Sequence, residues 1–430
     1  MKTYKEVVEW IHSLLPQGIK PGLARMEWML ERLGHPERRL KYIHVGGTNG
    51  KGSTVNFLRH IFVEGGYKVG TFTSPYIERF NERIAINGEP ISERDLVMVA
   101  KKVRPLVEEL SETELGTPTE FEVITTIAFE YFATIAYPDI VIMEVGLGGK
   151  YDSTNVIAPM VTLITNIGHD HMHILGKTKR EIAENKAGLI KSGVPVITTE
   201  EDEEILQVFA EIAKQKRTKM YTLGKDFGYE DYANHRERQT FTFYSPFNRL
   251  ENIEITMLGE HQVKNASLAL MAYTYVKTFL AFIVEEGDMR RGMSKAKWPG
   301  RFEKVREKPL IIIDGAHNPE GMNALAKTLK ENYADKNIYV LYAQTKEKDV
   351  NDMLKPLYPL AKEICFTTFD FHRAEQAANL YEAADFLQKT VSENWQEEIK
   401  KKRKALKKDD LYLITGSLYF ISEVRSYLKR

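Results

Sequence analysis

An apolar stretch, a glycine-rich turn and a helical pattern follow one another directly between residues 42 and 64. The turn reads HVGGTNGKGST (44–54), and the helical pattern ends at Gly65 and Gly66. A strand that feeds a helix in this way belongs in a parallel sheet, because the helix must cross back before the next strand begins. Further strands are expected at 69–72, 140–144, 161–165 and 195–198.

This alternation predicts an α/β fold with two domains. The first pattern stops near Trp298 and a second begins, with strands expected at 310–314, 338–342, 364–368 and 411–415. Since 430 residues are too many for one compact core, we predict a P-loop-type, mainly parallel domain of residues 1–297. A smaller, Rossmann-like α/β domain of residues 301–430 follows it.

Smaller elements are also expected within the first domain. Helices are predicted at 53–64, 119–135 and 178–191, the last opening with a capping box of Thr178 and Glu181. Residues 240–257 alternate in a strand-like way around Ser245 and Pro246, which predicts an antiparallel hairpin.

Composition excludes some classes of protein. Sixty Lys and Arg balance sixty Asp and Glu, so no overall charge attracts nucleic acid or an anionic membrane. The lysine-rich run 400–408 is better explained as a solvated helix face. The single cysteine, Cys365, fits a reducing compartment, and no apolar signal core or membrane span is visible. We expect a cytoplasmic monomer whose partners are small molecules.

The glycine-rich turn has the composition of a phosphate loop. Glycines allow backbone N–H groups to turn inward, and the following helix presents its positive end to an anion. Lys51 would then lie against the β- and γ-phosphates. The strict Walker pattern is not met, because its first glycine falls at Val45 and Gly52 separates Lys51 from Ser53. The alternative is a glycine-rich turn that binds nothing.

Two more strand ends carry polar groups suited to a cation. Glu144 ends the apolar run IVIME, where P-loop proteins place a carboxylate that orients Mg²⁺; the alternative is a buried acid paired with a base. The run His169, Asp170, His171, Met172, His173 could supply one metal ligand. Zinc is disfavoured because no cysteine lies nearby.

Other candidates have ordinary explanations of equal weight. Lys186 in ENKAGLIK could be a solvated helix lysine, and Glu120 and Glu122 could be the charged first turn of a helix. Asp314 and His317 in DGAHNPEG lie beyond a strand end, where ligands are expected, but they could also be a helix cap and a satisfied histidine. Ser417 lies at the start of the last helix, whose N-terminus could bind an anion, but this pattern alone is weak evidence for a site.

Taken in order, these motifs resemble the folylpolyglutamate synthase / dihydrofolate synthase family of Mur-type, ATP-dependent ligases. The resemblance covers nearly the whole chain. It is carried by KPGLARM (20–26), HVGGTNGKGST (44–54), TSPYIERFNERI (73–84), PTEFE (118–122), EVGLGGKYDSTN (144–155), NIGHDHMHILG (166–176), NKAGLIK (185–191), GEHQVKNA (259–266), WPGRFE (298–303), DGAHNPEG (314–321) and GSLYFISEVR (416–425).

The resemblance implies a site for ATP and Mg²⁺. It assigns ATP to Thr48, Asn49, Gly50, Lys51, Gly52, Ser53, Thr54, Asn265, Arg301 and Asp314. It assigns Mg²⁺ to Ser74, Glu144 and His171, and it matches Lys186 to a lysine that the family carries as a carbamate. Lys51, Lys186 and His317 are the expected catalytic residues.

The resemblance also implies the other substrates. His317 and Ser417 fall where the family binds glutamate, and Leu23, Thr119, Glu120, Phe121 and Asp152 resemble its pterin-side contacts. Three departures stand out. Lys150 replaces the usual arginine, Asn185 replaces the usual glutamate before Lys186, and QTKEKD (344–349) matches only loosely.

The implied reaction joins glutamate to a folate by way of an acyl phosphate. Its substrate is tetrahydrofolate, dihydropteroate or both. One rival is a cell-wall Mur ligase, against which TSPYIERFNERI and PTEFE favour folate. Another is a P-loop switch that makes no product, against which stand Lys186 and the second α/β domain.

Overall fold

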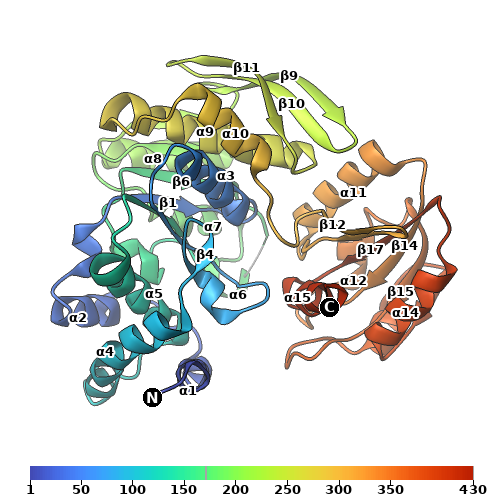
Figure 1. Ribbon diagram of the computed structural model, residues 1–430, viewed down its shortest axis with the longest axis horizontal. Helices are drawn as coiled ribbons and strands as arrows, with labels where there is room; N and C mark the ends of the chain where they lie inside the picture. Colours follow the sequence, from blue (N-terminus) through green and yellow to red (C-terminus); the bar gives the residue numbers. More distant parts are fainter. Residues whose placement is uncertain (170–171, 430) are drawn as a thin grey trace. The chain divides into compact units, whose positions relative to one another are not determined.

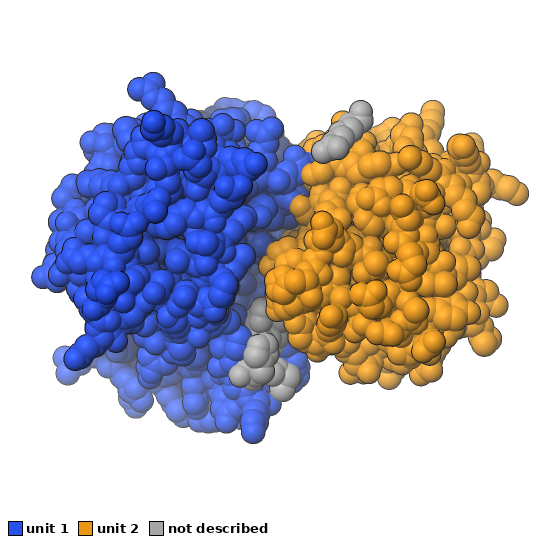
Figure 2. All heavy atoms as spheres, turned by 90° about the horizontal axis from the view of Figure 1, so that it is seen from below, with its two compact units in different colours: residues 1–231, 241–254, 263–296 blue, residues 232–240, 255–262, 297–430 orange. Residues whose placement is uncertain are grey.

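The computed structural model describes residues 1–169 and 172–429, and the chain forms two compact units (Figure 2). Unit 1 comprises residues 1–231, 241–254 and 263–296; unit 2 comprises residues 232–240, 255–262 and 297–430. The segments 232–240 and 255–262 therefore group with the C-terminal unit. No helix in the described part of the chain is long and apolar enough to cross a membrane.

Unit 1 is built on an eight-stranded sheet with the order β4-β3-β2-β5-β1-β6-β7-β8. Strands β2, β5, β1, β6, β7 and β8 are parallel, whereas β3 and β4 pair antiparallel at one edge. The strands are β1 Tyr42–Gly46, β2 Val69–Phe72, β3 Ile84–Ile86, β4 Glu89–Pro90, β5 Ile140–Glu144, β6 Val161–Ile164, β7 Val196–Thr198 and β8 Met220–Thr222.

Helices cover this sheet, so its central strands are buried throughout their length. Val141 and Met143 of β5 pack with α1, α2, α4 and α5 in one apolar cluster. Figure 1 shows these four helices grouped together in the N-terminal part of the chain. The α-helices of this part of the chain are α1 Tyr4–His12, α2 Ala24–Arg32, α3 Lys51–Glu64, α4 Glu93–Ser111, α5 Glu120–Tyr131, α6 Met172–Leu175, α7 Lys179–Ala187, α8 Glu203–Gln215, α9 Glu260–Leu280 and α10 Glu286–Lys295.

Short helical turns complete unit 1. The 3₁₀ turns are η1 Leu15–Gln17, η2 Pro36–Arg39, η3 Phe80–Arg83 and η5 Ser153–Val156, and a π-helical turn, η4 Phe132–Ala136, follows α5.

The order of the strands creates a ligand-binding edge. After β1 the chain moves across β5 to β2, whereas after β5 it moves in the opposite direction to β6. Loops that leave neighbouring parallel strands in opposite directions open a crevice beyond their carboxyl ends. The loops after β1 and β5 are HVGGTNGKGST and EVGLGGKYD.

A separate three-stranded sheet follows β8 in the chain. Its strands are β9 Gly228–His235, β10 Arg238–Tyr244 and β11 Arg249–Ile255, in the order β11-β10-β9. The hairpin predicted at 240–257 corresponds to β10 and β11. Strand β9 was not predicted, because its largely polar segment DYANH shows no apolar alternation.

Unit 2 holds a six-stranded sheet with the order β12-β13-β17-β14-β15-β16, parallel except at β12. Its strands are β12 Glu303–Glu307, β13 Leu310–Ile313, β14 Asn337–Tyr342, β15 Ala361–Phe366, β16 Lys389–Val391 and β17 Asp410–Thr415. Its helices are α11 Pro319–Tyr333, α12 Val350–Leu354, α13 Ala377–Ala383, α14 Trp395–Ala405 and α15 Leu418–Leu428.

Alternate residues of β13 feed two separate cores. Ile312 packs in a cluster with α11, α12 and α13, whereas Ile311 and Ile313 pack with α14 and α15. The sheet is therefore covered on both faces, which explains the continuous apolar runs of its strands. The α/β fold class predicted from the sequence is confirmed, and most predicted strands lie within one or two residues of their observed bounds.

Candidate active site

The phosphate loop joins β1 to α3 and holds a compact turn. Gly50 is the N-cap of α3 with φ +86°, and a Cβ there would overlap the side-chain oxygen of Asn265. Only glycine fits this position, because the backbone is left-handed and Asn265 of α9 lies directly against it. Lys51 folds back over the loop and donates from Nζ to the carbonyls of Gly47 and Thr48, both at 3.2 Å.

Asn166, just beyond β6, fixes the loop from the other side. Its Oδ1 accepts from the Asn49 backbone N–H at 3.0 Å, and its Nδ2 donates to the Asn49 carbonyl at 3.2 Å. The Thr48 hydroxyl accepts from the Gly168 N–H at 2.9 Å. The histidines of this segment were predicted to be candidates from the sequence, whereas Asn166 was not. The strand-end rule that selected Glu144 applies equally to Asn166.

Two further strand ends meet beside the loop. The Ser74 backbone N–H donates to Glu144 Oε2 at 3.1 Å, and the Glu144 side chain is buried with 4% exposed. Lys186 on α7 is equally buried and donates from Nζ to the Gly47 carbonyl at 2.8 Å. Lys186 is therefore not the solvated helix lysine that its sequence alone allowed. His171 lies outside the described residues.

The EVGLGG loop packs directly on the helix that carries Lys186. A Cβ on Gly149 would stand 2.7 Å from the Lys186 carbonyl oxygen, so glycine permits this close approach. The Lys150 N–H donates to the Asn185 carbonyl at 2.9 Å. Lys150 and Asn185 both differ from the residues usual in the family. The backbone contact between them does not depend on either side chain, so it tolerates both differences.

Asp152 organises this loop from within. Its Oδ2 accepts from the Leu147 N–H at 2.8 Å, and its Oδ1 accepts from the Thr154 N–H at 3.0 Å and from the Thr154 hydroxyl. Burial raises the pKa of Asp152, while the hydrogen bonds from Thr154 and Leu147 oppose that rise. The predicted pterin contact at Asp152 stays a prediction. Both oxygens of its carboxylate already accept hydrogen bonds from within the loop.

Behind Asp152 lies a buried histidine of β1. His44 Nε2 is 2.8 Å from the Thr154 hydroxyl oxygen. Because that hydroxyl donates its own proton to Asp152, it accepts from His44, so the proton of the imidazole is on Nε2. Complete burial lowers the pKa of His44 to about 3, and Lys191 adds to the effect.

Ion pairs join two motifs assigned to the pterin side, LARM and PTEFE, to each other and to TSPYIERFNERI. Arg25 Nε lies 3.0 Å from Glu122 Oε1, which joins LARM to PTEFE. Arg83 Nη2 lies 3.6 Å from Glu120 Oε1, which joins PTEFE to the segment after Ser74. Both pairs are largely buried, so Glu120 and Glu122 are more than a charged first helical turn.

The remaining pterin-side candidates lie on the same elements. Thr119 caps α5 through a capping box with Glu122, and Leu23 is the N-cap residue of α2. The ring of Phe121 lies against Gly146 of the EVGLGG loop and 5.7 Å from the ring of Phe72. The structure thus gathers Leu23, Thr119, Glu120 and Phe121 around α2 and the start of α5.

In unit 2, Asp314 ties the end of β13 to the chain that enters the domain. Its Oδ2 accepts from the Phe302 N–H at 2.7 Å, and its Oδ1 accepts from the Ala316 N–H at 2.8 Å. Burial raises the pKa of Asp314, opposed by Arg301 and by these two amides. Arg301 also donates to the Gly315 carbonyl at 3.3 Å, so the two predicted ATP residues of this unit lie together.

The glutamate-side candidates lie at the same edge. His317 Nδ1 donates to the Gly315 carbonyl at 2.8 Å, and Ser417 is the buried N-cap residue of α15, beyond β17. Lys348, beyond β14, donates from Nζ to the His317 carbonyl. Residues 344–349 match the family only loosely, so Lys348 was not predicted as a site residue, but the fold places it beside His317.

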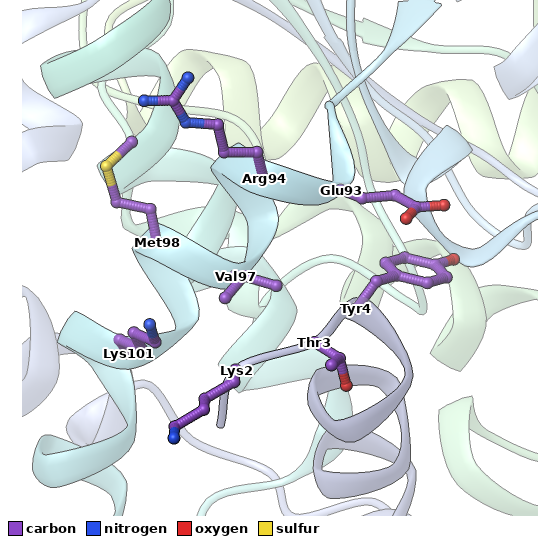
Figure 3. Close-up of a pocket in the computed structure, with 8 residues that line it drawn as sticks. All are labelled: Lys2, Thr3, Tyr4, Glu93, Arg94, Val97, Met98 and Lys101. Atoms are coloured by element: carbon purple, nitrogen blue, oxygen red, sulfur yellow. The ribbon is translucent and has the colours of Figure 1, made fainter.

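Unit 1 also has a shallow hollow of about 550 Å³ at the starts of α1 and α4 (Figure 3). Its lining residues are Lys2, Thr3, Tyr4, Glu93, Arg94, Val97, Met98 and Lys101. None of the predicted site residues is among them.

Comparison with known proteins places this geometry in a class. Residues 45–273 match the Mur ligase middle domain, and residues 300–418 match the Mur ligase glutamate ligase domain. The chain is therefore a Mur-type ligase. The first match spans the phosphate loop, Glu144 and Lys186, and the second spans Arg301, Asp314, His317 and Ser417.

Within that class, full-length relatives define the family. The chain is 45% identical over 427 residues to a dihydrofolate synthase/folylpolyglutamate synthase of Bacillus subtilis, covering 99% of each chain. A Mycobacterium tuberculosis folylpolyglutamate synthase complexed with ADP and AMPPCP superposes with a TM-score of 0.90 at 28% identity, covering 99% of both chains. A folylpolyglutamate synthase complex with AMPPCP and folate gives a TM-score of 0.83 at 33% identity, with 99% coverage of both.

The chain belongs to the folylpolyglutamate synthase / dihydrofolate synthase family. The family resemblance and the prediction of a ligase enzyme are confirmed. Of the two rivals, the Mur ligase describes only the wider class, and the P-loop switch that makes no product is wrong.

Proposed function

We propose that this enzyme uses ATP to ligate L-glutamate to a folate. The observation that carries the proposal is the phosphate loop, where the ammonium groups of Lys51 and Lys186 converge on Gly47. Lys51 is suited to meet the terminal phosphates, since an ATP phosphate would replace the two carbonyls that its ammonium now contacts. Asn265 lies against Gly50 and would contact ATP from α9.

The proposed reaction has two steps. The folate carboxylate attacks the γ-phosphorus of ATP, forming an acyl phosphate and releasing ADP. The glutamate amine then attacks the acyl carbon, phosphate leaves, and the amine loses a proton. Lys51 stabilises the negative charge that shifts toward the leaving group. Arg301 and Asp314 would bind ATP, while His317, Ser417 and Lys348 would hold the glutamate.

A magnesium site at Ser74 and Glu144 fits this scheme. Mg²⁺ prefers oxygen ligands, and the buried Glu144 carboxylate lies beside Ser74 at the loop edge. His171 is proposed as a third ligand from the family resemblance. When bound, Mg²⁺ would neutralise phosphate charge. Glu144→Gln should raise the Mg²⁺ concentration needed for half-maximal activity, and an unchanged requirement would place the metal elsewhere.

We also propose that Lys186 carries a carbamate in the active enzyme. The ammonium would first lose a proton, and the neutral amine would then add CO₂ and release a second proton. A buried cation would thereby become an anion beside the proposed Mg²⁺ site. High-resolution density at Nζ in protein shown to be active tests this directly. An unmodified amine in such crystals would contradict the proposal.

The folate substrate is tested by supplying the two acceptors separately. Purified protein with ATP, Mg²⁺ and glutamate would receive either dihydropteroate or tetrahydrofolate, with products measured by mass and ADP by a coupled assay. We propose activity on both, with shared ATP and glutamate residues and a pterin site at Leu23, Thr119, Glu120, Phe121 and Asp152. Activity on tetrahydrofolate alone would narrow the proposed activity to folate polyglutamylation. Substrate-independent ADP formation would contradict ligation.

A further inference from the structure

The loop 367–375, beyond β15 in unit 2, presents an arginine on an aromatic support. The rings of Phe371 and Tyr419 stack with centroids 4.3 Å apart and planes 16° apart. The guanidinium carbon of Arg373 lies 5.4 Å above the Phe371 ring. Both Tyr419 (41%) and the Arg373 side chain (44%) remain substantially exposed. A guanidinium that lies over an aromatic ring is held more firmly than that of an isolated surface arginine.

This loop is attached to the segment that carries Lys348. The Lys346 N–H donates to the Arg373 carbonyl at 3.0 Å, and the Glu375 N–H donates to the Gln344 carbonyl at 2.9 Å. Thr345 and Ala374 also form an antiparallel bridge. Lys348 in turn contacts the His317 carbonyl. Arg373 therefore belongs to one hydrogen-bonded array with the proposed glutamate residues.

The strand order gives this array a direction. Along the sheet edge come β13 with Asp314 and His317, β17 with Ser417, β14 with Lys348, and then β15 with Arg373. Neighbouring strands are about 4.8 Å apart, so β17 and β15 are separated by roughly 10 Å. Asp314 is assigned to ATP, where the acyl phosphate would form, so the attacking amine of glutamate is expected on the β13 side. Its carboxylates would then extend toward β14 and β15. Arg373 follows the last strand of that series.

We propose that Arg373 binds the side-chain carboxylate of the incoming glutamate and thereby selects glutamate over glutamine. The inference rests on the proposed function and extends it to a residue for substrate specificity. A guanidinium can make two parallel hydrogen bonds to a carboxylate, whereas an amide offers one acceptor oxygen and no charge. Arg373 already pairs with one carboxylate, since its Nη1 lies 3.3 Å from Glu347 Oε1.

Glu347 explains how the subsite is kept in place without substrate. The Arg373–Glu347 pair is exposed on both sides, and such pairs contribute little stability, so a substrate carboxylate can replace Glu347 at small cost. Glu347 is then a weak internal competitor for the same guanidinium. Removing its charge should make glutamate bind more tightly.

The test uses Arg373→Gln with Lys346→Gln as the matched control, since Lys346 is an exposed cation on the adjoining segment. Arg373→Gln should raise the KM for glutamate roughly 10- to 100-fold, as expected when a charged hydrogen bond is lost. The KM values for ATP and folate should stay within about twofold, and the preference for glutamate over glutamine should fall by a similar factor. Lys346→Gln should behave as wild type.

Further variants keep the outcomes separable. Arg373→Lys should restore part of the glutamate affinity, and Glu347→Gln should lower the KM for glutamate a few-fold. If wild-type enzyme ligates glutamate but Arg373→Gln keeps a normal KM, or weakens folate binding instead, the inference is overturned while the proposed function stands. If the wild-type enzyme does not ligate glutamate, the proposed function fails first.

Discussion

The phosphate loop of unit 1 and the sheet edge of unit 2 that is proposed to bind glutamate hold their cations in different ways. In unit 1 the Lys186 side chain is almost fully buried and, like Lys51, donates to a loop carbonyl. In unit 2 the Arg373 side chain is nearly half exposed and pairs with a surface carboxylate. The buried Lys186 is held in place before any ligand arrives, whereas the exposed Arg373 can exchange partners at small cost in free energy. Loss of a phosphate-loop lysine in unit 1 should therefore mainly reduce kcat, and loss of a proposed glutamate-binding residue in unit 2 should mainly raise the KM for glutamate.

The largest effect is expected for Lys51→Ala. Loss of one positioned charge at a phosphoryl-transfer site typically costs about 10²–10³ in rate. Steady-state ADP release would show a fall in kcat with a normal thermal unfolding profile. Near-normal turnover would contradict the assignment of Lys51 to the ATP phosphates, and the contrast between the two units would then no longer hold.

His317→Ala probes the unit 2 side of the comparison. We expect a roughly 10-fold or larger rise in the KM for glutamate, with both dihydropteroate and tetrahydrofolate as acceptors, because a charge-assisted contact is lost. Measuring glutamate dependence at saturating ATP and folate separates this from a rate effect. A fall in kcat with unchanged KM would show that unit 2 behaves like unit 1.

Thr154→Val asks how far the rigidity of unit 1 depends on its buried network. The change leaves the Asp152 carboxylate and the His44 N–H without the hydroxyl that joins them. We expect a loss of about 1–3 kcal/mol in unfolding free energy by urea titration. Thr154→Ser should keep most of the stability, because it restores the hydroxyl; equal losses in both variants would assign the effect to packing.

The smallest effect concerns pH. His44 has a pKa of about 3 in the folded protein, below its ordinary value of 6.5. Between these values the unfolded chain binds a proton that the folded protein does not, so stability falls as the pH falls. One such group contributes about 1 kcal/mol between pH 6.5 and 5.5. His44→Gln should flatten the pH dependence of unfolding by that amount, and an unchanged slope would show that His44 does not contribute.

Much of the fold followed from local sequence. Strands β2 and β5 were predicted to the residue, because parallel strands covered on both faces are continuous apolar runs. The capping boxes at Thr119 and Thr178 mark helix starts for the same local reason. By contrast, the helix predicted at 119–135 ends at Tyr131 and continues as a π-helical turn to Ala136, a change that periodicity does not reveal.

The candidate site divides in the same way. Glycines, Lys51 and Glu144 could be selected from the sequence, because a phosphate loop and a strand-end acid have short-range signatures. Asn166 follows a strand end and could have been selected by the same rule, although its contact with Asn49 could not be foreseen. Lys348 and Arg373 could not be selected, since the role of each depends on a contact with a residue far away in the chain.

The sequence by itself determined the α/β class, the phosphate loop and the family, because these depend on local patterns and on motifs in a fixed order. Only the tertiary structure decided that Lys186 is buried against Gly47 and that Asp152 supports its own loop. It also decided that the loops carrying His317 and Arg373 leave strands of the same sheet, β13 and β15. The physical reason is that strand order brings together loop ends separated by many residues. Burial and neighbouring charge, which set what each polar group can do, exist only after those ends have met.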